Sequence, residues 1–147
     1  MKKSLFALSC ALLALEALAA PIPDLVRELD QMPEVGKAFQ MYSGFLPVNV
    51  SSKRYHYIAV TSEKPTNNLI FWFNGGPGCS SMFGMTMEIG PYIMGDEDTR
   101  FKRNLHSWNK EAHVVYIEMP AGVGYSTCDE VDGPTSPGVK CYELAKR

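Results

Sequence analysis

Residues 71–84 read FWFNGGPGCSSMFG, an apolar run typical of a strand that gives way to glycine, proline and cysteine. A plain turn needs one or two such residues, because a single glycine supplies a positive φ angle. Four turn-forming residues in succession, Gly75-Gly76-Pro77-Gly78, therefore indicate a loop that does more than reverse the chain. The bare N–H groups of such glycines can point into a cavity with no side chains in the way.

The residues on either side predict a mixed or parallel α/β sheet. Residues 39–48 and 54–61 are rich in β-forming side chains and are separated by polar residues, which predicts an antiparallel hairpin. Residues 68–73 form a continuous apolar run, which predicts a strand buried on both faces, and residues 113–120 predict the next such strand. A second glycine-rich loop, residues 121–126, follows. Both loops therefore leave strands at the end where functional groups collect.

Two helices are predicted beside these strands. Residues 24–29 follow two prolines, with Asp24 as a candidate N-cap. Residues 82–89 predict a second helix, because apolar side chains recur there at helical spacing and would face the core: Met82, Met85 and Ile89. Ser80 and Ser81 precede this helix and are expected to cap it.

Composition and charge fit one globular domain. The chain has 147 residues, of which 46% are hydrophobic and 20% charged, and its formal net charge is −2. This balance offers no basic surface to a phosphate backbone, so we expect no nucleic-acid partner. No cysteine pair has the Cys-x-x-Cys spacing of a zinc or redox site, so we expect no metal and no other cofactor.

The first residues predict a secretory signal peptide at 1–19. Two lysines precede an apolar run from Leu5 to Leu15, and small residues follow up to Ala19. This stretch of eleven residues is too short to span a bilayer, which takes about 20 apolar residues, so no membrane anchor is expected.

Secretion changes how the cysteines and one asparagine are interpreted. Cys79, Cys128 and Cys141 follow the signal peptide, an odd number in an oxidising compartment. Two of them can pair, which leaves the third free or bonded to a group outside this chain. Asn49, in the triplet Asn-Val-Ser, matches a glycosylation acceptor in a predicted loop.

Three mechanisms use glycine-rich loops of this kind. A phosphate cradle needs Gly-x-Gly-x-x-Gly or a Lys-Ser/Thr pair after the glycines, and neither is present. A nucleophile elbow needs Gly-x-Ser-x-Gly, but Cys128 stands where the last glycine belongs, which makes Ser126 a poor nucleophile. The third mechanism is an oxyanion hole. In the α/β-hydrolase pattern one of its donors lies between the third strand and the first helix, where NGGPGCSS is found.

Two longer strings extend this likeness to a known family. LIFWFNGGPGCSSMFGMTMEIGPY (69–92) and NLHSWNKEAHVVYIEMPAGVGYS (104–126) resemble the serine carboxypeptidases, acid-active secreted and vacuolar or lysosomal peptidases of the α/β-hydrolase fold. The likeness runs from Tyr42 to Ser126. It implies the N-terminal portion of an α/β-hydrolase mixed sheet, an incomplete domain at residues 20–128, with a divergent tail at 129–147.

The resemblance implies roles for five residues near the glycines. Gly76 would give one N–H of the oxyanion hole, and the residue after the nucleophile would give the other. Asn74, Gly75 and Glu88 would bind the free C-terminal carboxylate of a peptide, with Trp72 in the same hydrogen-bonded group. A protonated Glu88 can donate to that carboxylate, so binding would be favoured at acid pH.

Other polar residues have more ordinary interpretations. In this family the cysteine at Cys79 commonly forms a disulfide with a later cysteine. No histidine lies at a readable distance to activate Cys79 as a nucleophile. His56, His106 and His113 are interpreted as structural.

One part of the family pattern has no match in these residues: the Gly-Glu-Ser-Tyr-Ala-Gly elbow that carries the nucleophile, with its later aspartate and histidine. We therefore expect the N-terminal part of a secreted serine carboxypeptidase for peptides or proteins with a free C-terminus, inactive by itself. The sheet would keep an unpaired edge beside residues 113–120. The alternatives are a truncated, non-catalytic protein that binds peptides or regulates a relative, or an incomplete gene model.

Overall fold

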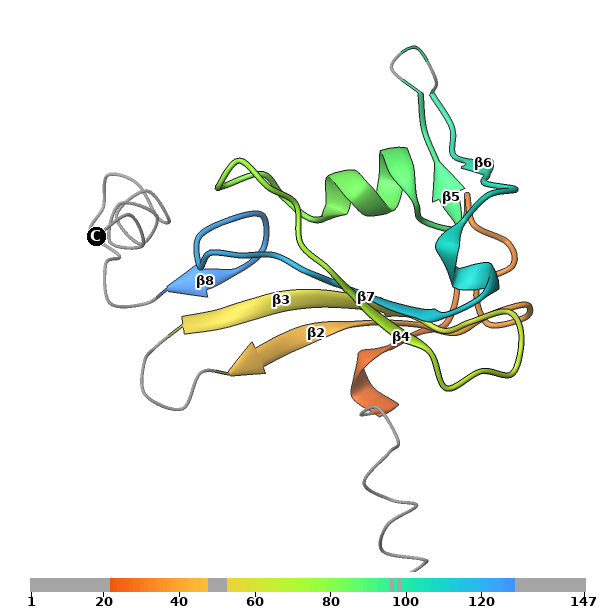
Figure 1. Cartoon of the computed structure of the whole chain (residues 1–147), viewed down its shortest axis with the longest axis horizontal. Coiled ribbons are helices and arrows are strands. Elements are labelled where there is room, and N and C mark those ends of the chain that lie inside the picture. The colour runs from red at the N-terminus through yellow and green to blue at the C-terminus, as the bar shows by residue number, and fades with distance from the viewer. Residues whose placement is uncertain (1–21, 48–52, 96, 98, 129–147) are drawn as a thin grey trace, which may run out of the picture.

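The computed structural model describes residues 22–47, 53–95, 97 and 99–128. Figure 1 shows a twisted sheet with a short helical segment above one of its faces. The predicted signal peptide at 1–19, the glycosylation candidate Asn49 and the tail at 129–147 lie outside the described residues. Within the described ranges, no helix has the length and apolar character needed to cross a membrane.

The sheet contains the predicted hairpin. β2 (Met41–Pro47) and β3 (Lys53–Val60) pair antiparallel over their whole length. A 3-10 turn, η1 (Ile22–Asp24), leads into β1 (Leu25–Val26), which pairs with β2. The helix predicted for residues 24–29 is therefore wrong. So short a helix makes few internal hydrogen bonds, and pairing with β2 satisfies the same backbone groups.

β7 (His113–Ile117) lies inside the sheet. It pairs antiparallel with β3 and parallel with β4 (Leu69–Trp72), so the sheet is mixed, as predicted. The strand order is β1-β2-β3-β7-β4, and β8 (Thr127–Cys128) also pairs with β3. The edge expected beside residues 113–120 is thus wrong, because β7 inserts between β3 and β4. β4 is the terminal strand of the described sheet.

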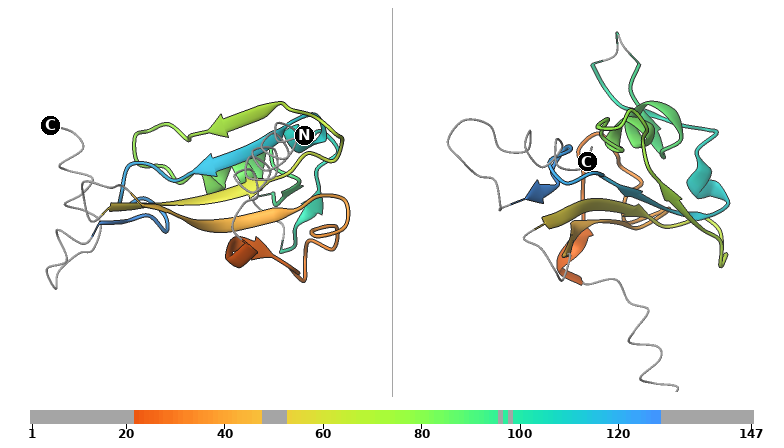
Figure 2. Two further views of the ribbon diagram at one scale, coloured as in Figure 1. Left: turned by 90° about the horizontal axis from the view of Figure 1, so that it is seen from below. Right: turned by 60° about the vertical axis from the view of Figure 1, so that its left-hand side comes forward.

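β4 is covered on one face only, which corrects the prediction of a strand buried on both. Ile70 and Trp72 pack against the core, whereas Leu69 and Phe71 are 54% and 57% exposed. The described residues place a layer on one side of the sheet, as Figures 1 and 2 show. A continuous apolar run cannot reveal which of its two faces is covered.

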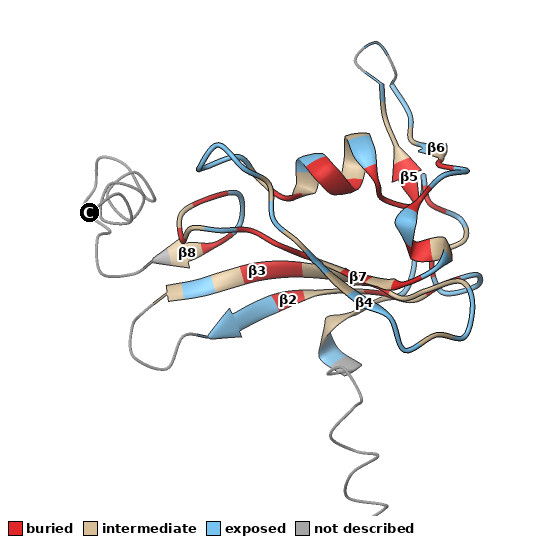
Figure 3. Cartoon of the chain, in the orientation of Figure 1, coloured by how far each residue is buried: buried red, intermediate tan, exposed pale blue. Residues whose placement is uncertain are grey.

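The core lies between the sheet and η2 (Gly84–Glu88), a π-helical turn. Met85 and Ile89 are buried and Met82 packs beside them, which confirms the predicted apolar stripe. Below η2 the buried positions of Figure 3 include β7, whose Val114 and Tyr116 are inaccessible to solvent. A short ribbon of β5 (Tyr92–Ile93) and β6 (Lys102–Arg103) and a 3-10 turn, η3 (Trp108–Lys110), complete this layer.

Two buried tyrosines lie on the neighbouring strands β3 and β7. The Tyr57 hydroxyl donates to Asp24 Oδ2 over 2.7 Å, which ties β3 to η1. Burial, with the hydrogen bond and the negative charge of Asp24, raises the pKa of Tyr57 to about 12. Burial alone raises the pKa of Tyr116 well above its ordinary value.

Candidate functional site

Two glycine-rich loops leave the same end of the sheet. β4 and β7 are parallel neighbours, so the chain leaves both strands in the same direction. We call residues 74–81, which follow β4, the GGPG loop, and residues 118–126, which follow β7, the GVG loop. The prediction that both loops lie at one end of the sheet is confirmed.

The ends of the GGPG loop are joined by one serine. Ser81 Oγ accepts from the Asn74 N–H over 3.1 Å and donates to the Ile117 carbonyl oxygen over 2.6 Å. Ser81 is 1% exposed and makes no helix cap, so that part of the prediction is wrong. Ser80 does bind the first helical turn, because its Oγ accepts from the Met82 N–H over 3.1 Å.

Between these anchors the glycines are exposed. The N–H groups of Gly75 and Gly76 make no hydrogen bond within the described ranges. A Cβ placed on Gly75 would meet no atom within 4 Å. Gly76 has a φ of +131°, a conformation that favours glycine. The loop thus presents two main-chain donors to solvent.

Trp72 and Asn74 form a hydrogen-bonded pair at the foot of this loop. Trp72 Nε1 donates to Asn74 Oδ1 over 2.7 Å, and the Gly84 N–H donates to the same oxygen over 3.2 Å. The amide nitrogen of Asn74 has no partner among the described residues and remains a third available donor.

Gly84 is a supporting residue that the sequence analysis missed. A Cβ at this position would lie 2.2 Å from Trp72 Nε1 and 2.9 Å from Asn74 Oδ1, so only glycine lets η2 approach the pair. The signal in the sequence was a glycine within a predicted helix, where glycine costs about 1 kcal/mol relative to alanine.

The Glu88 side chain makes no hydrogen bond to the Trp72–Asn74 pair. It is exposed on η2, and within the described ranges its carboxylate has no hydrogen bond or ion pair. Asn104 Nδ2 donates to its main-chain oxygen over 3.3 Å. The structure therefore brings Trp72 and Asn74 into contact beside the two glycines and leaves the Glu88 carboxylate free.

Cys79 carries an exposed free thiol among the described residues. The side chains of the other three cysteines lie outside the description, so the disulfide of Cys79 stays a prediction. The described residues also contain no group of three or more His, Cys, Asp or Glu side chains able to hold a metal ion.

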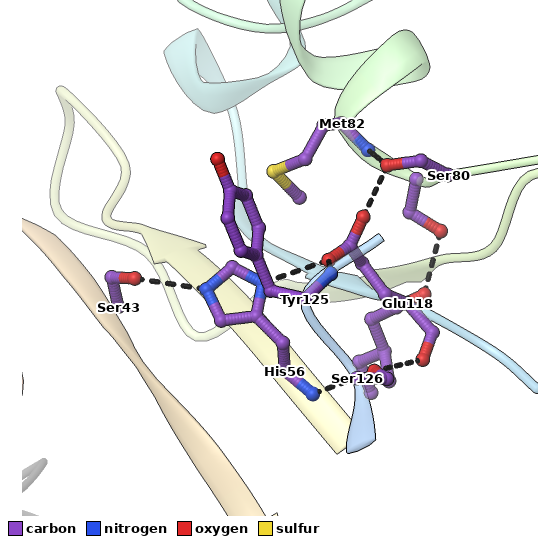
Figure 4. A network of polar contacts seen from close by, with 9 residues as sticks. Ser43, His56, Ser80, Met82, Glu118, Tyr125 and Ser126 are labelled. Atoms are coloured by element: carbon purple, nitrogen blue, oxygen red, sulfur yellow. Dashed lines mark hydrogen bonds and ion pairs between the residues drawn. The ribbon is translucent and has the colours of Figure 1, made fainter. Parts of the chain in front are cut away.

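The GVG loop folds around a buried carboxylate. Glu118 is inaccessible to solvent, and its Oε2 accepts from the Tyr125 N–H over 2.7 Å and from His56 Nδ1 over 3.0 Å. Its Oε1 accepts from the Ser80 hydroxyl, so the two loops meet at this carboxylate (Figure 4). Gly124 has a φ of +54°, and a Cβ there would lie 1.9 Å from Glu118 Oε1.

Ser126 completes the loop as a structural residue. Its Oγ accepts from the His56 N–H over 2.8 Å and donates to the Glu118 carbonyl oxygen over 2.7 Å. The Glu118 N–H donates in turn to the His56 carbonyl oxygen over 3.0 Å. Ser126 is 5% exposed, and its hydroxyl both accepts and donates within this network.

The histidines show the structural roles predicted for two of them. His56 is 6% exposed, and its Nε2 lies 3.0 Å from Ser43 Oγ. His113 Nδ1 accepts from the Ser62 N–H over 3.2 Å. The residue that sequence reasoning missed is Glu118, an acidic side chain at the end of an apolar run and the centre of the network.

Comparisons with known proteins agree with the resemblance seen in the sequence. The family model described as serine carboxypeptidase matches residues 32–139. The lysosomal protective protein of Mus musculus is 39% identical over 135 residues, which cover 87% of this chain and 28% of that protein. Serine carboxypeptidase-like 32 of Arabidopsis thaliana is 38% identical over 80% of this chain and 26% of its own length. A serine carboxypeptidase of Caenorhabditis elegans is 40% identical over 74% of this chain and 23% of its own length. The chain spans about a quarter of the length of these curated relatives.

Proposed function

The chain belongs to the serine carboxypeptidase family, and we propose that its GGPG loop recognises the free C-terminus of a peptide in a serine-type carboxypeptidase reaction. In that reaction a serine attacks the last peptide bond, an acyl-enzyme forms, and the C-terminal residue leaves. The observation that carries the proposal is the pair of exposed N–H groups at Gly75 and Gly76, which make no hydrogen bond to any residue that the structure describes.

Gly76 is proposed as one donor of the oxyanion hole. A negative charge develops on the carbonyl oxygen as the serine attacks, and main-chain N–H groups held in place stabilise it. Loss of one such donor typically lowers kcat by about 10²–10³-fold. The second donor would come from the residue after the nucleophile.

Asn74 and Gly75 are proposed to bind the substrate carboxylate, together with Glu88. Asn74 offers its free amide nitrogen, and Gly75 offers its N–H. Trp72 fixes Asn74 in the donating orientation, because the indole N–H occupies the amide oxygen. Charge-assisted hydrogen bonds of this kind are stronger than neutral ones.

Glu88 gives the proposed binding its pH dependence. A carboxyl group donates to a carboxylate only while it is protonated, and an ionised one repels it. Peptides with free C-termini should therefore bind more tightly at acid pH. Glu88→Gln keeps a donor at every pH, so binding to this variant should change little between acid and neutral pH.

The serine, aspartate and histidine of the reaction have no matching motif in these 147 residues. We therefore propose that the chain by itself releases no C-terminal residue. Incubation at acid pH with a blocked dipeptide tests this point. Release of the C-terminal residue that a serine inhibitor stops would contradict it.

The proposed location is the secretory pathway, with secretion or delivery to a vacuole or lysosome. The features of residues 1–19 support it, as does the likeness to a relative named for the lysosome. Glycosylation of Asn49 and a disulfide at Cys79 belong to the same proposal, because both form in that compartment.

Binding of a blocked dipeptide acid, compared with its amide, tests the recognition step. The acid should bind to the chain and the amide should not, because only the acid presents a carboxylate. Equal binding of the two, or no binding of either, would overturn the proposal. Selective binding without catalysis is also what the non-catalytic alternative predicts, and a transcript that continues into a Gly-Glu-Ser-Tyr elbow would exclude that alternative.

A further inference from the structure

We propose that Glu118 is a positioning residue that sets the GGPG loop in its ligand-binding conformation, with His56 holding Glu118 in place. This inference rests on the proposed function, because that function defines which ligand the GGPG loop binds. The contacts behind it are independent of that function. Glu118 lies in the GVG loop and would touch neither substrate nor oxyanion.

Three donors from three segments converge on the Glu118 carboxylate. They are the Ser80 hydroxyl of the GGPG loop, the Tyr125 N–H of the GVG loop and the His56 ring of β3. The carboxylate has no solvent exposure, so these donors replace the water that a carboxylate requires. A shift of any one segment would leave a buried oxygen unsatisfied.

Ser80 connects the Glu118 carboxylate to the GGPG loop and to Met82, which precedes η2. Its hydroxyl has a single proton, which it donates to Glu118, while its oxygen accepts from the Met82 N–H over 3.1 Å. Its neighbour Ser81 binds the Ile117 carbonyl oxygen over 2.6 Å. Two successive serines thus bind two successive residues at the end of β7, which fixes the backbone orientation there.

His56 on β3 holds the Glu118 carboxylate in position. The carboxylate accepts, so His56 Nδ1 donates to it, and Nε2 then accepts from the Ser43 hydroxyl. The ring also packs against Tyr125, with centroids 5.2 Å apart. Figure 4 shows the resulting line of contacts from Ser43 on β2 through His56 and Glu118 to Ser80.

The free donors of Gly75 and Gly76 lie between the anchored ends of the loop. Ser81 joins the loop's end to its start at Asn74, and Ser80 joins it to Glu118. Between these points the Cys79 N–H donates to the Gly75 carbonyl oxygen over 3.4 Å, a long hydrogen bond. The segment that carries the glycine N–H groups is therefore held by these anchors at both ends.

Glu118→Gln tests whether Glu118 positions the GGPG loop, because it alters the contact with Ser80 and can keep the other two. The Gln oxygen can face the two donors that share Oε2, His56 and Tyr125, and its NH₂ group then faces Ser80. The Ser80 hydroxyl must turn away, because two donors would otherwise point at each other. The fold keeps most of its contacts, while the charge-assisted bond that Ser80 donates is replaced by at most a weaker neutral bond from the Gln NH₂ group to Ser80 Oγ.

Ser80→Ala removes the same anchor from the other side, and Ser62→Ala is its matched control. Ser62 Oγ accepts from the Lys64 N–H over 3.2 Å, as Ser80 Oγ accepts from the Met82 N–H, but Ser62 is not bonded to Glu118. Amide hydrogen exchange of the whole chain, followed by NMR, gives the readout residue by residue. Asn74 and Met82 report on the loop, and Ala59 in the β2–β3 ladder reports on the sheet.

We expect Glu118→Gln and Ser80→Ala each to speed exchange at Asn74 and Met82 by at least tenfold, with Ala59 unchanged and Ser62→Ala like wild type. Both variants should also bind the blocked dipeptide acid at least tenfold more weakly, and the double variant no worse than either. Unchanged exchange at the loop, or equal acceleration at Ala59, would overturn the proposal. So would faster loop exchange with undiminished binding. If wild type does not bind the peptide, the proposed function fails, and the exchange pattern alone decides whether Glu118 positions the loop.

Discussion

The GGPG and GVG loops have similar compositions and opposite uses of their backbone. Each follows one of two parallel neighbouring strands and contains glycines with positive φ angles. In the GGPG loop, two glycine N–H groups remain exposed and unbonded within the described ranges. In the GVG loop, the Tyr125 N–H and the Ser126 side chain bond to Glu118, and Gly124 packs against its carboxylate.

Glycine content alone therefore does not distinguish a ligand-binding loop from the loop that supports it. Glycine permits close approach in both loops. In the GVG loop a buried acidic side chain lies against Gly124, whereas in the GGPG loop no atom of the described residues lies within 4 Å of the position that a Cβ on Gly75 would take. We infer that the GGPG loop is open for a ligand because the GVG loop supplies its anchor.

Gly124→Ala should have the largest effect on stability, because it attacks the GVG loop at its closest contact. The new Cβ would lie 1.9 Å from Glu118 Oε1 on a residue with a φ of +54°. Displacing the buried carboxylate from its donors should lower the free energy of unfolding by about 3–5 kcal/mol. Urea denaturation measures this loss in the free energy of unfolding. A loss under about 1 kcal/mol would show that Gly124 tolerates a Cβ beside the Glu118 carboxylate.

Ser81→Ala should rank second, because it breaks the tie between the GGPG loop and β7 without adding atoms. It leaves the Asn74 N–H and the Ile117 carbonyl oxygen without their partner. Such unsatisfied buried groups cost about 1–3 kcal/mol, so we expect a loss of about 2 kcal/mol in the same assay. Ser62→Ala is the control and should change stability by less than about 0.5 kcal/mol. Equal losses in the two variants would contradict the role given to Ser81.

Trp72→Phe should have a smaller effect, confined to the foot of the GGPG loop. It keeps an aromatic ring beside Trp108 and removes the donor to Asn74 Oδ1. One neutral hydrogen bond is worth about 0.5–1.5 kcal/mol, so the stability loss should be near 1 kcal/mol. Because Asn74 is no longer held, binding of a blocked dipeptide acid should weaken as well. Binding equal to wild type would show that Trp72 does not orient Asn74.

Gly75→Ala should have the smallest effect on stability and so gives the sharpest contrast with Gly124→Ala. Its Cβ meets no atom within 4 Å, and its φ is not among the positive values. The free energy of unfolding should change by no more than about 0.5 kcal/mol. The methyl group would nevertheless lie where the carboxylate is proposed to bind, so affinity for the dipeptide acid should fall. A loss of stability like that of Gly124→Ala would remove the distinction between the loops.

Local patterns predicted the elements with the most regular side chains. The hairpin of β2 and β3 and the apolar stripe of η2 follow from alternation and helical spacing, and both are confirmed. The strand order did not follow, because it depends on long-range pairing that places β7 between β3 and β4. For the same reason the residues could not show that β4 is covered on one face only.

The glycine loop was predictable and its support was not. Asn74, Gly75 and Gly76 stand together in one string, so a local motif reveals them. Glu118 bonds to Ser80 and His56, which lie 38 and 62 positions away in the chain. No periodicity connects residues so far apart. An acidic residue at the end of a buried strand is the one local hint, because a buried charge requires partners.

β3 pairs along one side with two separate strands, β7 at residues 57–60 and β8 at residues 53–54. The GVG loop is thus the segment between two stretches of the same ladder, and its ends are brought together by the sheet. Pairing of β7 and β8 with β3 closes the GVG loop, so most of the loss of chain entropy accompanies that pairing. The ordering of the residues around Glu118 that remains is local. We expect assembly to run from the β2–β3 hairpin to the addition of β7 and β8, with the carboxylate network formed last.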